Sequence, residues 1–176
     1  MSHRARDLAV RVRERLGLEL PPANASLLLA YAPIDVVHVD WPQDLAGVLL
    51  LRHGRVLIGL NRRHSAGRRH FSFWHEVGHY VLHRGGHPDG GAIACGSLPS
   101  TSPDAESEAD AFATEVLMPE AWVLGSRRDA RDVAAMARRL RVSPQAMARR
   151  LRELDITPPR PARPCAAWPR PGPVSP

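Results

Sequence analysis

The sequence predicts an α+β fold in which a small antiparallel or mixed sheet packs on a long helix, with a helical hairpin near the C-terminus. Three observations predict it. The stretches 34–40 and 48–61 are rich in β-branched and other apolar residues, as strands are. Residues 68–84 repeat apolar side chains with the period of a helix. Residues 129–140 and 144–154 show two helical stretches joined by a short RVSP turn.

The N-terminal half of the chain supplies two further helices and the hairpin of the sheet. Residues 4–18 carry apolar side chains at intervals of four with arginines between them, which predicts an amphipathic helix. Asn24 is a favourable cap for a short second helix over residues 25–32. The two apolar runs of residues 48–61 flank a turn at His53-Gly54, and this arrangement predicts a β-hairpin.

The C-terminal half predicts one more helix between two irregular segments. Residues 85–104 are rich in glycine, proline and serine and predict a loop, which is long enough to indicate a functional or disordered segment. Residues 105–119 predict a helix that ends at a proline. We expect one domain over residues 1–156, which includes the 129–154 hairpin, and a disordered proline-rich tail over residues 157–176.

Composition excludes several classes of protein. A chain of 176 residues can bury a real core, and it has no run of about 18 apolar residues that would predict a membrane span. The N-terminal stretch has basic residues but no uninterrupted apolar region and no small-residue cleavage site, so we expect no signal peptide there. Cys95 and Cys165 lie too far apart for a metal pair and predict no disulfide framework, so we expect a cytoplasmic protein. The net charge of +6 comes from arginine alone, without lysine. GC-rich codons explain part of that excess, so the charge is weak evidence of nucleic-acid binding.

The stretch FSFWHEVGHYVLH carries the chemistry of the sequence. His75 and His79 are four residues apart, so in a helix their imidazoles can point at one metal ion. Glu76 is rotated by about 100° from His75 and can stand beside the ion as a general base for a water molecule. The alternative is an ordinary amphipathic helix in which His79 belongs to the core. A metal site needs a third ligand, because catalytic zinc usually has three.

The candidates for that third ligand differ in position. A histidine six residues after the motif is excluded, because Gly85 is there. His83 continues the same helix too far along the axis, and we interpret it as a helix C-terminal residue. The ESEAD stretch offers Glu106 and Asp110, four residues apart, so that one can bind the metal while the other accepts the N–H of a ligating histidine. Two neighbouring acids lie off that face and are expected in solvent: Asp104 and Glu108.

Three motifs, in order, carry a family resemblance: RRHFSFWHEVGHYVLH, ESEADAFATEVLMP and RVSPQAMARRLREL. Together they resemble the ImmA/IrrE family of metallo-endopeptidases, which are gluzincin-like zinc peptidases, over roughly residues 30–154. The resemblance implies a zincin-like fold, zinc held by His75, His79 and Glu106, and Glu76 as the catalytic base. It also implies a protein substrate, since family members cleave helix-turn-helix transcriptional repressors and thereby release stress-response or mobile-element genes.

Single positions refine this resemblance. Asn61 matches an asparagine found in many members before the motif helix. Asp110 stands where many members have asparagine, and either residue can accept a hydrogen bond. Trp74 replaces a smaller residue and either narrows the cleft or packs against the sheet, of which packing is favoured. The strand at 55–61 is expected to offer an edge to an extended peptide. Four residues are equally good candidates to stabilise the oxyanion: Tyr31, His70, Tyr80 and His87.

The 129–154 segment also matches a second function of a different class, namely DNA binding. Two amphipathic helices joined by a short turn also resemble a helix-turn-helix, as in a metal-responsive DNA-binding regulator. Six arginines would then contact phosphates: Arg138, Arg139, Arg141, Arg149, Arg150 and Arg152. The apolar residues of the same helices indicate a hairpin docked on a core, so we favour the peptidase. Its expected partner is a protein, not a membrane, and the sequence does not define an oligomeric state.

Overall fold

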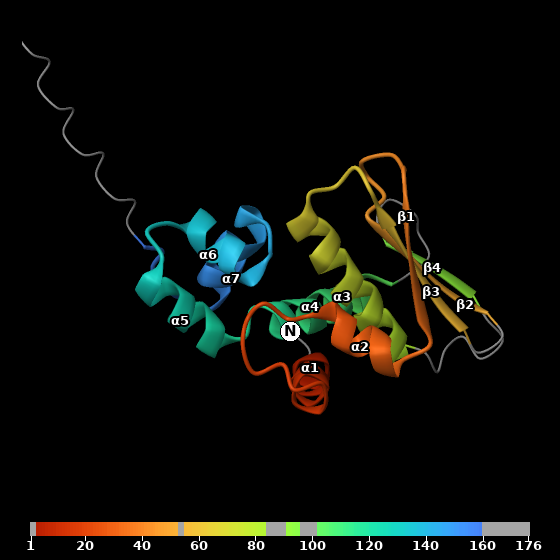
Figure 1. Cartoon of the computed structure of the whole chain (residues 1–176), viewed down its shortest axis with the longest axis horizontal. Helices are drawn as coiled ribbons and strands as arrows, with labels where there is room; N and C mark the ends of the chain where they lie inside the picture. Colours follow the sequence, from red (N-terminus) through yellow and green to blue (C-terminus); the bar gives the residue numbers. More distant parts are fainter. Residues whose placement is uncertain (1–2, 53–54, 84–90, 96–101, 160–176) are drawn as a thin grey trace, which may run out of the picture.

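The computed structural model describes residues 3–52, 55–83, 91–95 and 102–159. In that part of the chain, helices and strands fall into separate runs, as the α+β prediction expects (Figure 1). The helices are α1 (His3–Arg15), α2 (Ala25–Tyr31), α3 (Ala66–His83), α4 (Pro103–Leu117), α5 (Glu120–Asp129), α6 (Val133–Leu140) and α7 (Pro144–Glu153). The strands are β1 (Ile34–Val39), β2 (Gly47–Arg52), β3 (Arg55–Asn61) and β4 (Gly91–Cys95).

The four strands form one mixed sheet in the order β1-β3-β2-β4. β1 pairs with β3 in parallel, and β2 pairs antiparallel with both β3 and β4. Ile58 stands opposite Val36 on one side and Leu49 on the other. The expectation that residues 55–61 offer a free edge is therefore wrong, because both sides of β3 are already hydrogen-bonded.

The prediction of a long loop over residues 85–104 is also incorrect in its middle. Residues 91–95 form β4, whose backbone pairs with β2 from Gly47↔Cys95 to Leu51↔Gly91. Its sequence, GAIAC, has one β-branched residue and is depleted in the side chains that favour strands. The paired residues of β2 are 40 to 48 positions earlier in the chain, so no local pattern predicts this strand.

The helix α3 covers one face of the sheet, and Figure 1 shows no described helix over the opposite face. Leu49, Ile58 and Leu60 point from the sheet into the core and are buried. Phe73 and Val77 of α3 are buried in the same core, with exposed fractions of 3% and 1%. The helix thus has one side fixed by the sheet, and its other side is free to meet α4.

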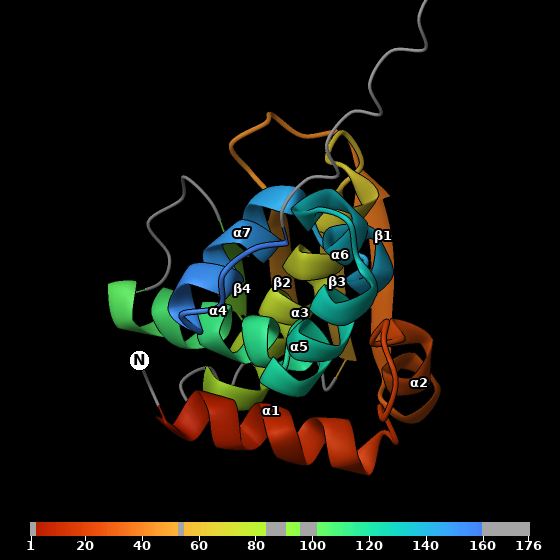
Figure 2. The same ribbon diagram turned by 90° about the vertical axis from the view of Figure 1, so that its left-hand side faces the viewer.

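The remaining helices surround α3 and α4. α1 lies along α4 and buries Ala5 and Ala9, as Figure 2 shows. The sequence did not indicate α5, which buries Trp122 and Val123 and leads into the α6–α7 hairpin on the side away from the sheet (Figure 1). Asn24 caps α2 by accepting a hydrogen bond from the Ser26 amide, as predicted. None of the described helices has the length and apolarity needed to cross a membrane.

Several predicted features lie outside the described residues. These are the hairpin turn at His53-Gly54, Gly85, His87 and most of the proline-rich tail, from residue 160 on, which includes Cys165. The side chains of Tyr31 and Cys95 are likewise outside the described part.

Candidate metal centre

The helix α3 presents two histidines, one turn apart, on its buried side. His75 is 7% exposed and His79 is fully buried. Their Nε2 atoms lie 3.1 Å apart, and the two rings are tilted by 77° to each other. Residues i and i+4 of a helix lie one above the other on the same face, so the spacing in the sequence produces this convergence.

The helix α4 brings a carboxylate to the same point. Glu106 Oε2 lies 3.3 Å from His75 Nε2, and Glu106 Oε1 lies 3.3 Å from His79 Nε2. The two helices can approach this closely because Gly78 of α3 faces Ala109 of α4. A Cβ on residue 78 would stand 3.1 Å from the Ala109 Cα and would push the helices apart. The glycine within the motif therefore has a packing role that brings the three side chains together.

The atoms of this group are spaced as ligands of one ion. The candidate ligand atoms of His75, His79 and Glu106 all lie within 4.8 Å of one another. Bonds of about 2.0–2.1 Å in a tetrahedron place neighbouring ligand atoms about 3.3 Å apart. The two imidazole nitrogens are 3.1 Å apart, and each lies 3.3 Å from a different oxygen of Glu106, which is close to that spacing. Two imidazoles and one carboxylate are therefore arranged as a group that fits a divalent metal ion.

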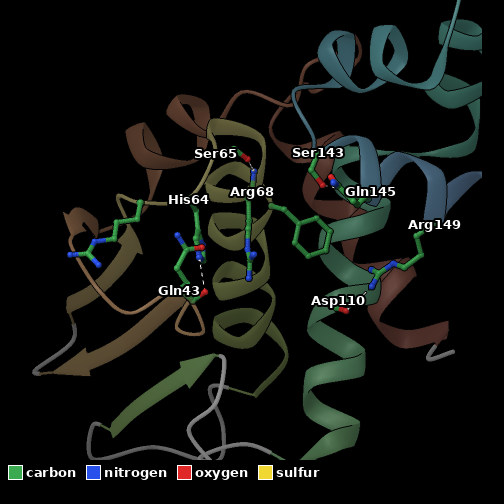
Figure 3. A pocket seen from close by; sticks show the side chains of 11 residues that line it. Gln43, His64, Ser65, Arg68, Asp110, Ser143, Gln145 and Arg149 are labelled. Atoms are coloured by element: carbon green, nitrogen blue, oxygen red, sulfur yellow. Dashed lines mark hydrogen bonds and ion pairs between the residues drawn. The ribbon is translucent and has the colours of Figure 1, made fainter.

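Asp110, one turn after Glu106 on α4, orients the first histidine. Its Oδ1 lies 3.0 Å from His75 Nδ1. Its Oδ2 lies 3.3 Å from Arg149 Nη1, and Figure 3 shows these two side chains facing each other. Burial raises the pKa of Asp110, but the hydrogen bonds and charges of His75 and Arg149 outweigh burial and hold that pKa below its usual value. The ionised carboxylate accepts the Nδ1 proton, so the lone pair of the neutral imidazole is at Nε2, which faces the other ligands.

Glu76 is fully buried and lines the cavity beside these three side chains. This site cavity has a volume of about 250 Å³ and is lined by Ala46, Arg68, Phe71, Ser72, His75, Glu76, Glu106 and Asp110. Gly47, the first residue of β2, lies directly against the Glu76 carboxylate. The start of β2 therefore forms the wall behind the candidate base.

The loop between β1 and β2 is held in place by two buried side chains, one at the end of β3 and one just after it. Asn61 Nδ2 donates to the carbonyl oxygens of Trp41, Pro42 and Leu45 at 3.2, 2.8 and 2.7 Å. His64 Nε2 lies 2.9 Å from the Gln43 carbonyl oxygen. Asn61 is fully buried, and its three hydrogen bonds hold the loop that leads into Gly47. The resemblance singled out Asn61; neither His64 nor Gly47 carried a recognisable signal beyond its residue type.

Other predicted residues do not belong to the group of His75, His79 and Glu106, here called the metal group. His83 Nε2 is 3.8 Å from Glu108 Oε2. Burial, together with the neighbouring His79, lowers the pKa of His83. Glu108 is thus half-buried, although we expected it in solvent, whereas Asp104 is exposed as expected. Trp74 is fully buried, so it packs in the core and does not narrow the cleft. His70 faces backbone carbonyls, and it is not among the residues that line the site cavity.

The α6–α7 hairpin docks on α4 through α7, and half of its six candidate arginines form ion pairs with carboxylates of the protein. Arg150 is 3% exposed and pairs with Glu115 of α4 at 2.7 Å. Arg149 pairs with Asp110, and Arg139 pairs with Asp129. The apolar side of the hairpin is buried through Met136, Leu140, Met147 and Leu151. A helix-turn-helix that reads DNA needs a free recognition helix, so this packing does not favour the DNA-binding alternative.

Comparison with known proteins agrees with this geometry. The model of the peptidase M78 family, described as the IrrE N-terminal-like domain, matches residues 30–152. The chain belongs to this family. None of the curated proteins matches the chain. The matched segment begins within α2 and ends in α7, so it contains the sheet, α3, α4 and every side chain of the metal group.

Membership in the IrrE N-terminal-like family confirms the sequence resemblance and implies a metallopeptidase-type function. The mixed sheet packed on α3 is consistent with the zincin-like fold that the resemblance implied. The group of His75, His79 and Glu106 gives such a protein a place for a metal ion. α1 lies outside the matched segment. It packs along α4, the helix that carries Glu106.

Proposed function

We propose that the chain is a zinc-dependent endopeptidase, with zinc held by His75, His79 and Glu106 and with Glu76 as the general base. The observation that carries this proposal is the convergence of the three ligand atoms to within 4.8 Å of one another, beside a carboxylate that lines the neighbouring cavity. A zinc ion bound there would supply Lewis acidity, lowering the pKa of a water molecule and polarising a carbonyl group.

The protein's own side chains have separate parts in this proposal. Glu76 takes a proton from the attacking water at its carboxylate and delivers it to the amine that leaves. Asp110 holds the His75 ring through Nδ1 and keeps its Nε2 directed at the ligand group. Asn61 and Gly47 fix the wall against which Glu76 rests. Zinc is favoured because two imidazoles and one carboxylate are a typical catalytic zinc donor set.

The finer proposal concerns the substrate. The motifs resemble those of peptidases that cleave helix-turn-helix repressors, so we propose a repressor as the protein substrate and the switching on of stress or mobile-element genes as the outcome. Such a substrate is bound to DNA, so the proposed place of action is the cytoplasm.

Metal analysis and a cleavage assay together test the peptidase proposal. We expect about one zinc per chain by elemental analysis, and cleavage of the repressor encoded beside the gene by the wild-type protein. The variant Glu76→Gln should retain zinc and lose cleavage, and Glu106→Gln should lose both. Asp104→Asn, an exposed acid on the same helix, is the matched control and should change neither. Cleavage that persists in Glu76→Gln would refute the mechanism.

A further inference from the structure

A second cavity, here called the side pocket, opens beside the site cavity and has a volume of about 600 Å³ (Figure 3). Arg68, Phe71 and Asp110 line both cavities, so the side pocket continues directly from the metal group. Its walls come from the β1–β2 loop, the segment between β3 and α3, the first half of α3, and α7, and they include Gln43, Arg63, His64, Ser65, Gln145 and Arg149. Its volume is within the range of cavities that bind ligands.

The charge of the side pocket is strongly unbalanced. Three arginines line it, Arg63, Arg68 and Arg149, against the single carboxylate of Asp110. Asp110 is already engaged by His75 and Arg149, and Arg149 also pairs with Glu153 at 3.4 Å. Within the described residues, the guanidinium groups of Arg63 and Arg68 have no ion pair or hydrogen bond. Two positive charges are therefore available to a ligand.

Arg68 is the better placed of the two. Its side chain extends along α3 into the space between Gln43 on one side and Asp110 with Arg149 on the other (Figure 3). It lines the site cavity as well as the side pocket, whereas Arg63 lines the side pocket alone. A carboxylate that reached Arg68 would therefore belong to a molecule that also extends past the metal group.

The backbone adds to the positive potential of this pocket. Ser65, immediately before α3, accepts a hydrogen bond from the Arg68 amide, and Ser143 caps α7 by accepting one from Ala146. Both serines line the side pocket, so the N-terminal ends of two helices face it. Helix N-termini carry partial positive charge and favour anions. The arginines and the helix ends act in the same direction.

We propose that the side pocket is a specificity subsite that takes an acidic side chain of the peptide substrate, with Arg68 as the residue that selects it. This inference rests on the proposed peptidase function for its substrate, an extended peptide that passes the metal group. Side chains along such a peptide are about 3.3 Å apart, so the acidic residue lies within a few positions of the cleaved bond. A guanidinium offers paired N–H donors that match a carboxylate, so aspartate and glutamate are favoured over neutral isosteres.

A binding measurement tests the subsite without requiring cleavage. The protein is the full chain as Glu76→Gln, loaded with zinc, and the probes are fluorescein-labelled octapeptides of alanine, serine and leucine. One glutamate, one glutamine or one lysine is placed at each position in turn. We expect one position at which glutamate binds about tenfold more tightly than glutamine by fluorescence anisotropy. A panel in which no glutamate peptide binds more tightly than its glutamine partner would overturn the proposal.

Substitutions assign the preference to one arginine. In the same background, Arg68→Gln should abolish the preference for glutamate, and Arg68→Glu should replace it with a preference for lysine at that position. Arg128→Gln removes the same charge from an exposed position on α5 and should leave the preference intact. A glutamate preference that survives both Arg68 substitutions would refute the assignment of the subsite to this residue.

Cleavage of the same peptides by the wild-type protein separates failure of the subsite from failure of the peptidase. Hydrolysis that needs Glu76 but shows no preference for glutamate would remove the subsite and leave the peptidase. Selective binding of glutamate peptides without hydrolysis would remove the peptidase and leave an acidic-peptide site. We expect the peptidase and the subsite to hold together. Hydrolysis should then need Glu76 and should be about tenfold faster for the selected glutamate peptide than for its glutamine partner.

Discussion

The backbone of Gly47 lies so close to the Glu76 carboxylate that no residue with a side chain fits at position 47 without displacing it. A Cβ on residue 47 would overlap the Glu76 Oε1 atom and would stand 3.1 Å from Cδ and 3.2 Å from Cγ. Glu76 is fully buried and lines the site cavity, so a side chain on residue 47 would displace its carboxylate within that cavity. Gly47 has no left-handed backbone angle, so it is required for its lack of a side chain and not for its flexibility. The strand that begins at Gly47 thereby sets the position of the proposed base.

The variant Gly47→Ala should therefore move the carboxylate of Glu76 and spare the metal group. We expect hydrolysis to fall about a hundredfold, because a displaced general base loses most of its contribution to the rate. The loss should appear in kcat more than in KM, and zinc content measured by elemental analysis should be unchanged. Zinc lost together with activity would contradict a role restricted to Glu76.

The chain offers a matched control for this glycine. Gly125 lies within α5, and an added Cβ there meets no atom within 4 Å. Gly125→Ala should keep full hydrolysis and zinc content. It should also raise the free energy of unfolding slightly, since alanine favours a helix by about 1 kcal/mol over glycine.

Asp110 offers a second prediction, which concerns metal affinity. Asp110→Ala removes the acceptor of the His75 Nδ1 proton, so the ring can rotate and its Nε2 atom is no longer fixed. Loss of such a partner typically weakens metal binding by about 10–100-fold. Competition with a coloured chelator measures this change. Asp110→Asn keeps an acceptor oxygen and should bind zinc more tightly than Asp110→Ala; equal affinity of the two variants would contradict an orienting role.

Most of the fold was readable from local patterns because the helices here are strongly periodic and clearly capped. Asn24, Ser102, Asp132 and Ser143 each accept a hydrogen bond at the start of their helix. The metal group was also readable in outline, since the spacing of His75 and His79 determines their geometry in any helix.

What the sequence did not reveal depends on contacts between distant segments. β4 is a strand only because β2 pairs with it, and β3 is central only because β1 and β2 lie on its two sides. Gly47 is needed because it lies against Glu76, which is 29 positions later in the chain. A glycine in a sequence gives no indication of which distant residue it contacts. Arg150 carries the same charge as the exposed arginines around it, yet the docking of α7 on α4 makes it part of the core.

That buried arginine gives a third prediction. Arg150 donates to the Met118 carbonyl at 2.9 Å and pairs with Glu115 at 2.7 Å, with only 3% of its side chain exposed. Arg150→Ala leaves the Glu115 carboxylate without its partner and should lower the free energy of unfolding by about 3–5 kcal/mol in urea titrations. Arg152→Ala, at an exposed position two residues on, should change it by less than about 0.5 kcal/mol. Similar effects of the two substitutions would show that the pair is not part of the core.

His70 ties three segments together and makes stability depend on pH. Its Nδ1 lies 3.0 Å from the Arg141 carbonyl oxygen and its Nε2 lies 2.9 Å from that of Ala23. Burial lowers the pKa of His70, and the hydrogen bonds to these two carbonyls offset that effect only in part. The unfolded chain, with a histidine pKa of about 6.5, therefore binds a proton at a higher pH than the folded protein does.

The sign of this difference fixes the fourth prediction. Where the unfolded state binds more protons, stability rises with pH, so His70 should cost stability as the pH falls from about 6.5 toward its lowered folded-state pKa. Urea titrations at several pH values between 7.5 and 5 measure the slope. His70→Gln should reduce it, and His38→Gln, at an exposed position on β1, is the control for loss of a histidine. An unchanged slope in His70→Gln would mean that the proton is taken up elsewhere.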